Sequence, residues 1–243
     1  MKTILVTVFT ISILLLSCKK ENSANPTANS PTIPNNSVTV EGIFTAYHNV
    51  NGIYNWSANA KFWESTNSSI FIDSDSVSIN SNWLGNYSGT FIFIKHQEWL
   101  ASSTPINFFS NINWKTTGSA KVPAINHTNS NFMPYMDVSY LTTTTVSKVV
   151  GVTISHPNIN STKTEYKIFE PTSSGGSLFL LKTVIGNSTG VTFTPSELSA
   201  IPTGSNGAIR IVAYSDELVS PQAAVNFTFS NQCELQNYIN ITN

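Results

Sequence analysis

The sequence has few charged residues and only two cysteines. Charged residues make up 10% of its 243 positions, whereas soluble domains average about 25%, so solubility must rest on Asn, Ser and Thr. The formal net charge is −1, which provides no basic surface for a nucleic acid. The composition therefore predicts no nucleic-acid partner.

Long apolar runs are also lacking, with one exception near the N-terminus. Residues 4–16 form an apolar stretch interrupted only by hydroxyl side chains, and Lys2 precedes it. The stretch has the length of a signal-peptide hydrophobic region and falls short of the ~20 residues that cross a bilayer as a helix. We therefore expect residues 1–17 to be a signal peptide and no later segment to span a membrane as a helix.

The next residues resemble the lipobox of bacterial lipoproteins, in which a small residue precedes a cysteine. Here the motif is Leu15-Leu16-Ser17-Cys18. The resemblance implies cleavage before Cys18, a diacylglycerol on its sulfur and usually an N-acyl chain such as palmitate. Each buried methylene contributes about 0.8 kcal/mol, and stable anchoring takes more than one chain. The alternative is an ordinary cleaved signal in which the cysteine is incidental.

The start of the mature chain, Cys18-Lys19-Lys20-Glu21-Asn22, looks like that of many lipoproteins of the Bacteroidetes phylum. This resemblance implies a lipid-anchored location at the bacterial outer membrane. Acidic residues after the cysteine favour the cell surface in that group, but here one follows two lysines, so the cell surface and the periplasmic face both stay open. With Cys18 lipidated, Cys233 has no partner for a disulfide or a thiolate metal site. We expect Cys233 to be a small buried or terminal residue.

The rest of the chain divides into a tether and two β-rich halves. Residues 18–37 contain three prolines and almost nothing to bury, which indicates a flexible tether. Beyond them helical periodicity is nearly absent, and short alternating runs of β-branched and aromatic residues recur. We predict an all-β fold of two tandem antiparallel β-sandwich domains, immunoglobulin-like, over residues 38–140 and 141–243. One large sandwich is the alternative.

The C-terminal half has the more regular strand rhythm. Six expected strands separated by turn residues are typical of a sandwich, and over roughly residues 145–232 this half resembles an immunoglobulin-like or fibronectin type III module. Thr194-Pro195-Ser196-Glu197 is a capping box with proline at the first helical position, which predicts one helical turn through Leu198. The strands expected in the whole chain are residues 38–44, 54–62, 70–72, 76–79, 89–94, 149–154, 165–170, 178–184, 190–193, 208–214 and 224–229.

Recognised catalytic and metal-binding motifs are missing from the sequence. None of the four histidines, His48, His96, His127 and His156, lies at a metal-ligand spacing from another histidine, a cysteine or a carboxylate. The residues around His127 and His156 predict solvated loop positions. No Gly-x-Ser-x-Gly, His-Glu-x-x-His or phosphate-loop motif occurs. We expect no metal, no cofactor and no enzymatic activity; a triad assembled from distant residues stays open.

One short segment invites two further interpretations. Asp73 and Asp75 alternate as ligands of a hard cation can, but the glycine and the distal glutamate of an EF-hand are lacking, which favours a solvated β-turn. Asp75-Ser76-Val77 matches the short Asp-Ser/Thr-aliphatic motif of Bacteroidetes protein O-glycosylation. Ser76 is therefore a candidate O-glycosylation site.

Aromatic residues give the main indication of a binding function, because exposed rings stack on sugars. Strand alternation places Trp56 on one face with Ala58, Ala60 and Phe62, so Trp56 is expected in the core and Trp63 on the opposite face. All five tryptophans lie in the N-terminal half: Trp56, Trp63, Trp83, Trp99 and Trp114.

Trp83, in a stretch typical of a loop, and the nearby Tyr87 are the best candidates for an exposed ligand-binding platform, with Trp63 as a third. The alternative is that most of the tryptophans pack in the core or under loops.

Three functions follow as hypotheses. The first is a non-enzymatic, lipid-anchored cell-envelope protein that binds a ligand, such as a carbohydrate, through aromatic residues of the N-terminal half. The second is a structural or protein-binding envelope lipoprotein, in which edge strands or loops dock another envelope protein. The third is a hydrolase without a recognised motif.

Overall fold

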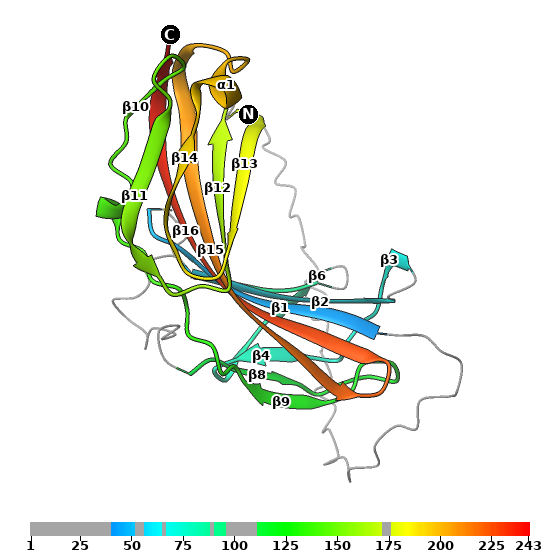
Figure 1. The fold of residues 1–243 in the computed structure, drawn as a ribbon. Helices are drawn as coiled ribbons and strands as arrows, with labels where there is room; N and C mark the ends of the chain where they lie inside the picture. Colours follow the sequence, from blue (N-terminus) through cyan, green and yellow to red (C-terminus); the bar gives the residue numbers. More distant parts are fainter. Residues whose placement is uncertain (1–39, 52–55, 65–66, 88–89, 96–110, 172–175) are drawn as a thin grey trace, which may run out of the picture. The chain divides into compact units, whose positions relative to one another are not determined.

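The computed structural model describes residues 40–51, 56–64, 67–87, 90–95, 111–171 and 176–243. Most of these residues lie in β-strands, which confirms the predicted all-β sandwich fold (Figure 1). The predicted signal peptide, Cys18, the tether, His96 and Trp99 lie outside the described residues. No helix within the described ranges is long and apolar enough to cross a membrane.

The described strands extend across both predicted halves. Those before residue 141 are β1 (Val40–Asn49), β2 (Trp56–Glu64), β3 (Asn67–Phe71), β4 (Val77–Ile79), β5 (Asn82–Trp83), β6 (Gly85–Tyr87), β7 (Thr90–Lys95), β8 (Asn113–Thr116) and β9 (Ile125–Thr128). A 3-10 turn, η2 (Val138–Tyr140), precedes β10 (Thr145–Ser147), β11 (Val152–Ile159), β12 (Lys163–Phe169), β13 (Leu178–Ile185), β14 (Ser188–Phe193), helix α1 (Pro195–Leu198), β15 (Gly204–Gln222) and β16 (Val225–Thr242).

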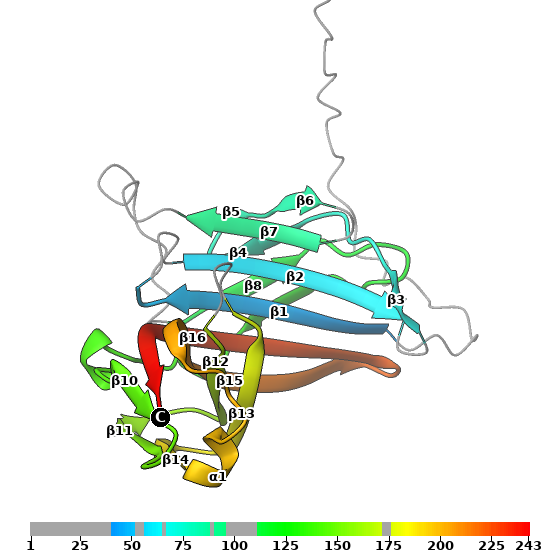
Figure 2. The same cartoon turned by 90° about the horizontal axis from the view of Figure 1, so that it is seen from above.

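The strands form three sheets. The long sheet has the order β13-β12-β15-β16-β1-β2-β7-β6, with β10 added beside β16 and β3 beside β2. A four-stranded sheet has the order β5-β4-β8-β9, and β11 pairs with β14 in a two-stranded sheet. Most neighbours are antiparallel, as predicted, but β16 pairs in parallel with both β1 and β10. Figure 2 shows β2, β1 and β16 side by side.

The β15–β16 hairpin connects the two predicted halves. Its strands span 19 and 18 residues, far beyond the short segments expected from the sequence. Residues 208–214 of β15 pair with β12, whereas residues 225–234 of β16 pair with β1 (Figure 1). The expected division between residues 140 and 141 is therefore crossed by a hairpin that both halves share.

An aromatic cluster packs the four-stranded sheet onto the long sheet. Phe44 in β1 is fully buried. Its ring centroid lies 5.3 Å from those of Phe62 and Trp114, 5.5 Å from that of Phe227 and 4.6 Å from that of Phe229. Trp114 belongs to β8 of the four-stranded sheet, so its contact with Phe44 identifies the inner faces of both sheets. Edge-to-face and stacked aromatic pairs of this kind stabilise a core beyond simple burial.

The predicted capping box and helical turn are confirmed between β14 and β15. The Thr194 hydroxyl accepts a hydrogen bond from the backbone N–H of Glu197, whose carboxylate accepts one from the backbone N–H of Thr194 at 2.8 Å. Pro195 occupies the first turn, and Leu198 is buried. A hydrogen bond from Lys182, followed by the bond from the Thr194 backbone, lowers the pKa of Glu197 to about 2.

Candidate functional site

The three aromatic candidates lie on three different strands. Trp83 ends the two-residue strand β5, and 57% of it is exposed. Trp63 in β2 is half-buried, and its indole Nε1 donates a hydrogen bond to Glu41 Oε2 at 3.1 Å. Tyr87 ends β6, but its side chain lies outside the described part of the structure.

The register of the four-stranded sheet places Trp83 in a row of polar side chains. Trp83 lies opposite Ser78, Ser78 opposite Lys115, and Lys115 opposite Asn126. Directly opposed residues share a face of a sheet. Their neighbours Val77, Ile79 and Trp114 are fully buried and face the long sheet, so the row lies on the other side of the four-stranded sheet. Trp83, Lys115 and Asn126 are exposed there, whereas Ser78 is only 3% exposed. We call this surface, formed by Trp83, Ser78, Lys115 and Asn126, the Trp83 face.

Hydrogen-bonded pairs flank the Trp83 face along the strands. Asn113 donates to Asn126 Oδ1 at 2.8 Å and to Thr128 Oγ1 at 3.2 Å. At the other end the hydroxyls of Ser76 and Thr117 lie 2.9 Å apart. The candidate O-glycosylation residue Ser76 is therefore half-exposed beside this surface, with its hydroxyl hydrogen-bonded to Thr117.

A tight turn fixes the position of Trp83. Asn80 and Ser81 connect β4 to β5 with φ of 45° and 65°, the left-handed pair that a two-residue hairpin of type I′ requires. Asn tolerates this conformation best among non-glycine residues. The Asn80 carboxamide oxygen also accepts a hydrogen bond from the Asn113 backbone at 2.7 Å, which ties the turn to β8. The stretch predicted as a loop is therefore a hairpin that displays Trp83.

Trp63 faces away from Trp83. In β2 the buried residues Ala58, Ala60 and Phe62 face the core, as predicted, and Trp63 lies on the outer face of the long sheet opposite Glu41. The Trp83 face belongs to the other sheet and points the opposite way. The two tryptophans therefore cannot contact one small ligand together, whereas Lys115 and Asn126, which the sequence did not single out, lie in the same row as Trp83.

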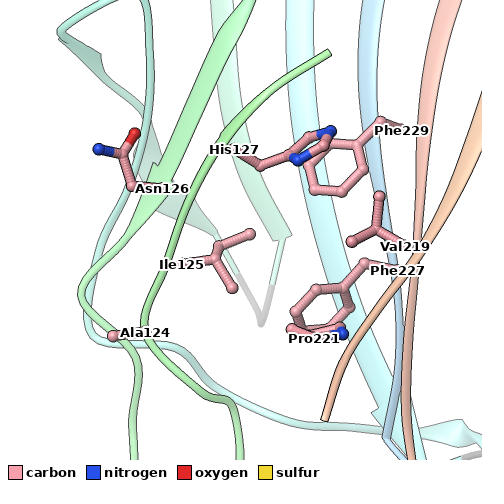
Figure 3. A pocket seen from close by; sticks show the side chains of 8 residues that line it. All are labelled: Ala124, Ile125, Asn126, His127, Val219, Pro221, Phe227 and Phe229. Carbon is pink, nitrogen blue, oxygen red and sulfur yellow. The ribbon is translucent and has the colours of Figure 1, made fainter. Parts of the chain in front are cut away.

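A groove separates β9 from the β15–β16 hairpin (Figure 3). Its volume is about 280 Å³. The His127 ring centroid lies 4.2 Å from that of Phe229, and His127 Nε2 lies 3.4 Å from Glu217 Oε2. Apolar side chains form most of the walls, and the lining residues are Ala124, Ile125, Asn126, His127, Val219, Pro221, Phe227 and Phe229.

The expectation of solvated loop histidines is wrong for both His127 and His156. His127 lies in β9 and contacts Phe229. His156 lies in β11 and is 8% exposed, with Nε2 2.6 Å from the Tyr166 hydroxyl. Pro157 follows His156 inside the strand. A proline is typical of loops and of edge strands. The sequence predicted a loop at this position, whereas the structure has a strand.

The half-buried His48 and the buried Cys233 form a neutral pair between β1 and β16. The His48 ring stacks on Trp56 at 3.8 Å between centroids, and His48 Nδ1 lies 3.6 Å from Cys233 Sγ. Burial lowers the pKa of His48 to about 4 and raises the pKa of the Cys233 thiol to about 12. A nucleophilic cysteine requires a thiolate, so this pair contributes to packing. The expectation that Cys233 is buried is confirmed.

The outer face of the long sheet carries an internally paired charge network. Although burial opposes ionisation, hydrogen bonds from Lys167, Lys163 and Tyr214 lower the pKa of Glu165 to about 2. Arg210, the chain's only arginine, donates to Gln236 Oε1 at 2.8 Å and lies 3.5 Å from Glu234. These charges neutralise one another and leave little for a ligand.

Comparison with known proteins adds no family. No family model matches the chain, and no curated protein matches it.

The His48 environment predicts acid sensitivity at moderately low pH. The pKa of His48 falls from 6.5 in the unfolded chain to about 4 in the folded protein. Between these two pH values, His48 is therefore protonated in the unfolded chain and neutral in the folded protein. The free energy of unfolding should therefore fall as the pH is lowered from 6.5 towards 4. Replacing His48→Gln should flatten this slope, measured by urea unfolding at several pH values.

Glu165 and Glu197 titrate in a lower window and do not mask this effect. Their pKa values drop from 4.5 to about 2, so their contribution is present above pH 4.5 and is lost only below it. An unchanged slope in the His48→Gln variant between pH 6.5 and 4.5 would contradict the assignment.

Proposed function

We propose that this chain is a lipid-anchored, non-enzymatic binding protein of the bacterial outer membrane, which recognises a carbohydrate on the Trp83 face. The observation that carries the proposal is the exposed indole of Trp83 in a row with Ser78, Lys115 and Asn126. Cys18 is the proposed attachment point of the lipid, on the strength of the lipobox resemblance.

An exposed tryptophan at this position suits a sugar ligand. Tryptophan is a large hydrophobic side chain that is usually covered, and covering about 100 Å² of apolar surface contributes about 2.5 kcal/mol. The C–H face of a pyranose can cover the ring, while amide and ammonium groups beside it hydrogen-bond the sugar hydroxyls. Lys115 and Asn126 are both exposed and supply such groups.

The composition of the Trp83 face supports binding more than hydrolysis. Most glycosidases use two carboxyl groups on either side of the scissile bond. None of the four residues of the Trp83 face is a carboxylate. The face therefore offers stacking and hydrogen bonds without an acid and base pair.

A second candidate function, docking of an extended peptide from another envelope protein, is favoured by the edges of the groove. The Asn129 N–H bonds to the Ile112 carbonyl of the neighbouring segment, so by antiparallel alternation the backbone groups of Asn126 and Thr128 point away from β8. Across the groove, the part of β15 beyond Tyr214 has no strand beside it other than β16 in the described structure. A peptide strand could pair there and insert apolar side chains.

The lipid anchor predicts a specific labelling pattern. In a bacterial host grown with labelled palmitate, the full chain should incorporate label, because an acylated cysteine forms the new N-terminus. Cys18→Ser should abolish incorporation, whereas Cys233→Ala, which removes the other cysteine, should retain it. Label retained in Cys18→Ser would contradict the anchor.

The Trp83 face predicts loss of glycan binding in Trp83→Ala. On a glycan array, the full lipidated protein in detergent should bind at least one carbohydrate, and the variant should bind it about tenfold or more weakly because the stacking surface is gone. Thermal unfolding should change little, since the ring is exposed.

Tyr238→Ala is the matched control, because Tyr238 is 69% exposed and lies on the outer face of the long sheet. Binding that is equally weakened by both changes, or by neither, would overturn the proposed site.

If a peptide docks in the groove, its binding should depend on Val219. A photo-crosslinking residue at position 125, whose side chain lines the groove, should capture one protein in the native envelope, with the crosslink mapped to an extended apolar segment. A synthetic peptide of that segment should bind the full chain, and Val219→Asp should abolish binding by placing a charge in the groove. Leu218→Asp, a neighbouring change at a side chain that is 69% exposed, should not. Equal effects of the two changes would argue against the groove.

A further inference from the structure

The Trp83 face has a regular spacing set by the sheet. Neighbouring strands lie about 4.8 Å apart, so Lys115 is about 10 Å and Asn126 about 14 Å from the position of Trp83 along the row. The strand spacing is close to the length of one sugar unit in an extended oligosaccharide. A glycan that crosses the strands therefore meets Trp83, Lys115 and Asn126 with its first, third and fourth units, and its second unit lies over the buried Ser78.

The residues that flank the row along the strands favour a ligand that runs across the strands. Asn113 hydrogen-bonds Thr128 and Asn126, and Ser76 hydrogen-bonds Thr117. These flanking groups are already partnered, so a ligand gains little by extending over them. The bond from Asn113 uses the carboxamide oxygen of Asn126, so the Asn126 N–H groups can still donate to a ligand.

Lys115 gives the row a positive charge that no described carboxylate neutralises. Its side chain is exposed, and within the described part of the structure it makes no ion pair. Several other cations are paired with a glutamate: Lys121 with Glu64, Lys163 and Lys167 with Glu165, Lys182 with Glu197, and Arg210 with Glu234. Lys115 is the only charged residue of the row, so its ammonium group favours an anionic ligand at that position.

We infer that the ligand is an acidic oligosaccharide that crosses the four strands, with one ring on Trp83 and a carboxylate or sulfate two units further on, at Lys115. Asn126 then donates to the fourth unit. The inference rests on the proposed carbohydrate function and adds the charge, the minimum length and the direction of the ligand. It also assigns Lys115 as the residue that determines specificity.

An array of matched glycans tests this inference. It should carry β-1,4-linked oligosaccharides of two, four and six units, each as a neutral, a uronate and a sulfated form on several backbones. We expect the full protein to bind acidic tetramers about three- to tenfold more tightly than neutral ones at low salt, the range of an exposed charge-assisted contact. Dimers should show no such preference, because two units cannot reach from Trp83 to Lys115.

The Lys115→Gln variant removes the positive charge of the row and keeps a polar side chain of similar length at this exposed position. This variant should bind neutral and acidic tetramers equally, while Lys148→Gln, which removes a lysine from the β10–β11 connection, should keep the acidic preference. High salt should also remove the preference by screening. The uronate and sulfate arms show which anionic group the site takes.

The outcomes distinguish the inference from the function on which it rests. Trp83-dependent binding with equal affinity for neutral and acidic forms, or an acidic preference that survives in Lys115→Gln, overturns the inference and leaves carbohydrate binding in place. Failure of every glycan to bind overturns both.

Discussion

The structure depends on the parallel ladder between β1 and β16. Ten residue pairs form it, from Val40 beside Val225 to Asn49 beside Glu234. Because β16 continues past this ladder and pairs with β15 and β10, one strand contributes to the packing of both halves. The aromatic cluster around Phe44 depends on the same ladder, since Phe229 lies directly opposite Phe44. That cluster holds the four-stranded sheet, and therefore the Trp83 face, against the long sheet.

The outward faces of the long sheet and of the four-stranded sheet carry different kinds of polar groups. The long sheet exposes paired charges around Glu165 and Arg210, which satisfy one another. The four-stranded sheet exposes amides and hydroxyls together with the Trp83 indole and the Lys115 ammonium group, which makes no ion pair with any described residue. Charged residues are scarce in this chain, and on the Trp83 face an exposed indole and an exposed ammonium group lie in one row. The contrast supports assignment of the ligand site to the four-stranded sheet.

Local sequence patterns predicted individual strands and the helical turn well. They did not predict features that depend on which strands pair and in which register. Alternation located β1, β2 and β11 to β14, and the capping box at Thr194 located α1. The Asn- and Gln-rich second half of β16 was missed, because its polar residues alternate outward and only pairing with β15 makes it a strand. Trp83 could be singled out as an aromatic residue in a polar stretch. Lys115 and Asn126 could not, because their place beside it follows from strand order, which no local pattern encodes.

The β1–β16 ladder also determines the order of assembly. Partners in it are 185 residues apart in sequence, as for His48 and Cys233, and contacts this distant form late because a long loop must close first. β1 can therefore pair with β2 before it pairs with β16. If Cys18 is acylated as proposed, one end of this closing loop is already fixed at the membrane. Folding of such an anchored chain then ends when β16 pairs with β1 close to the bilayer surface.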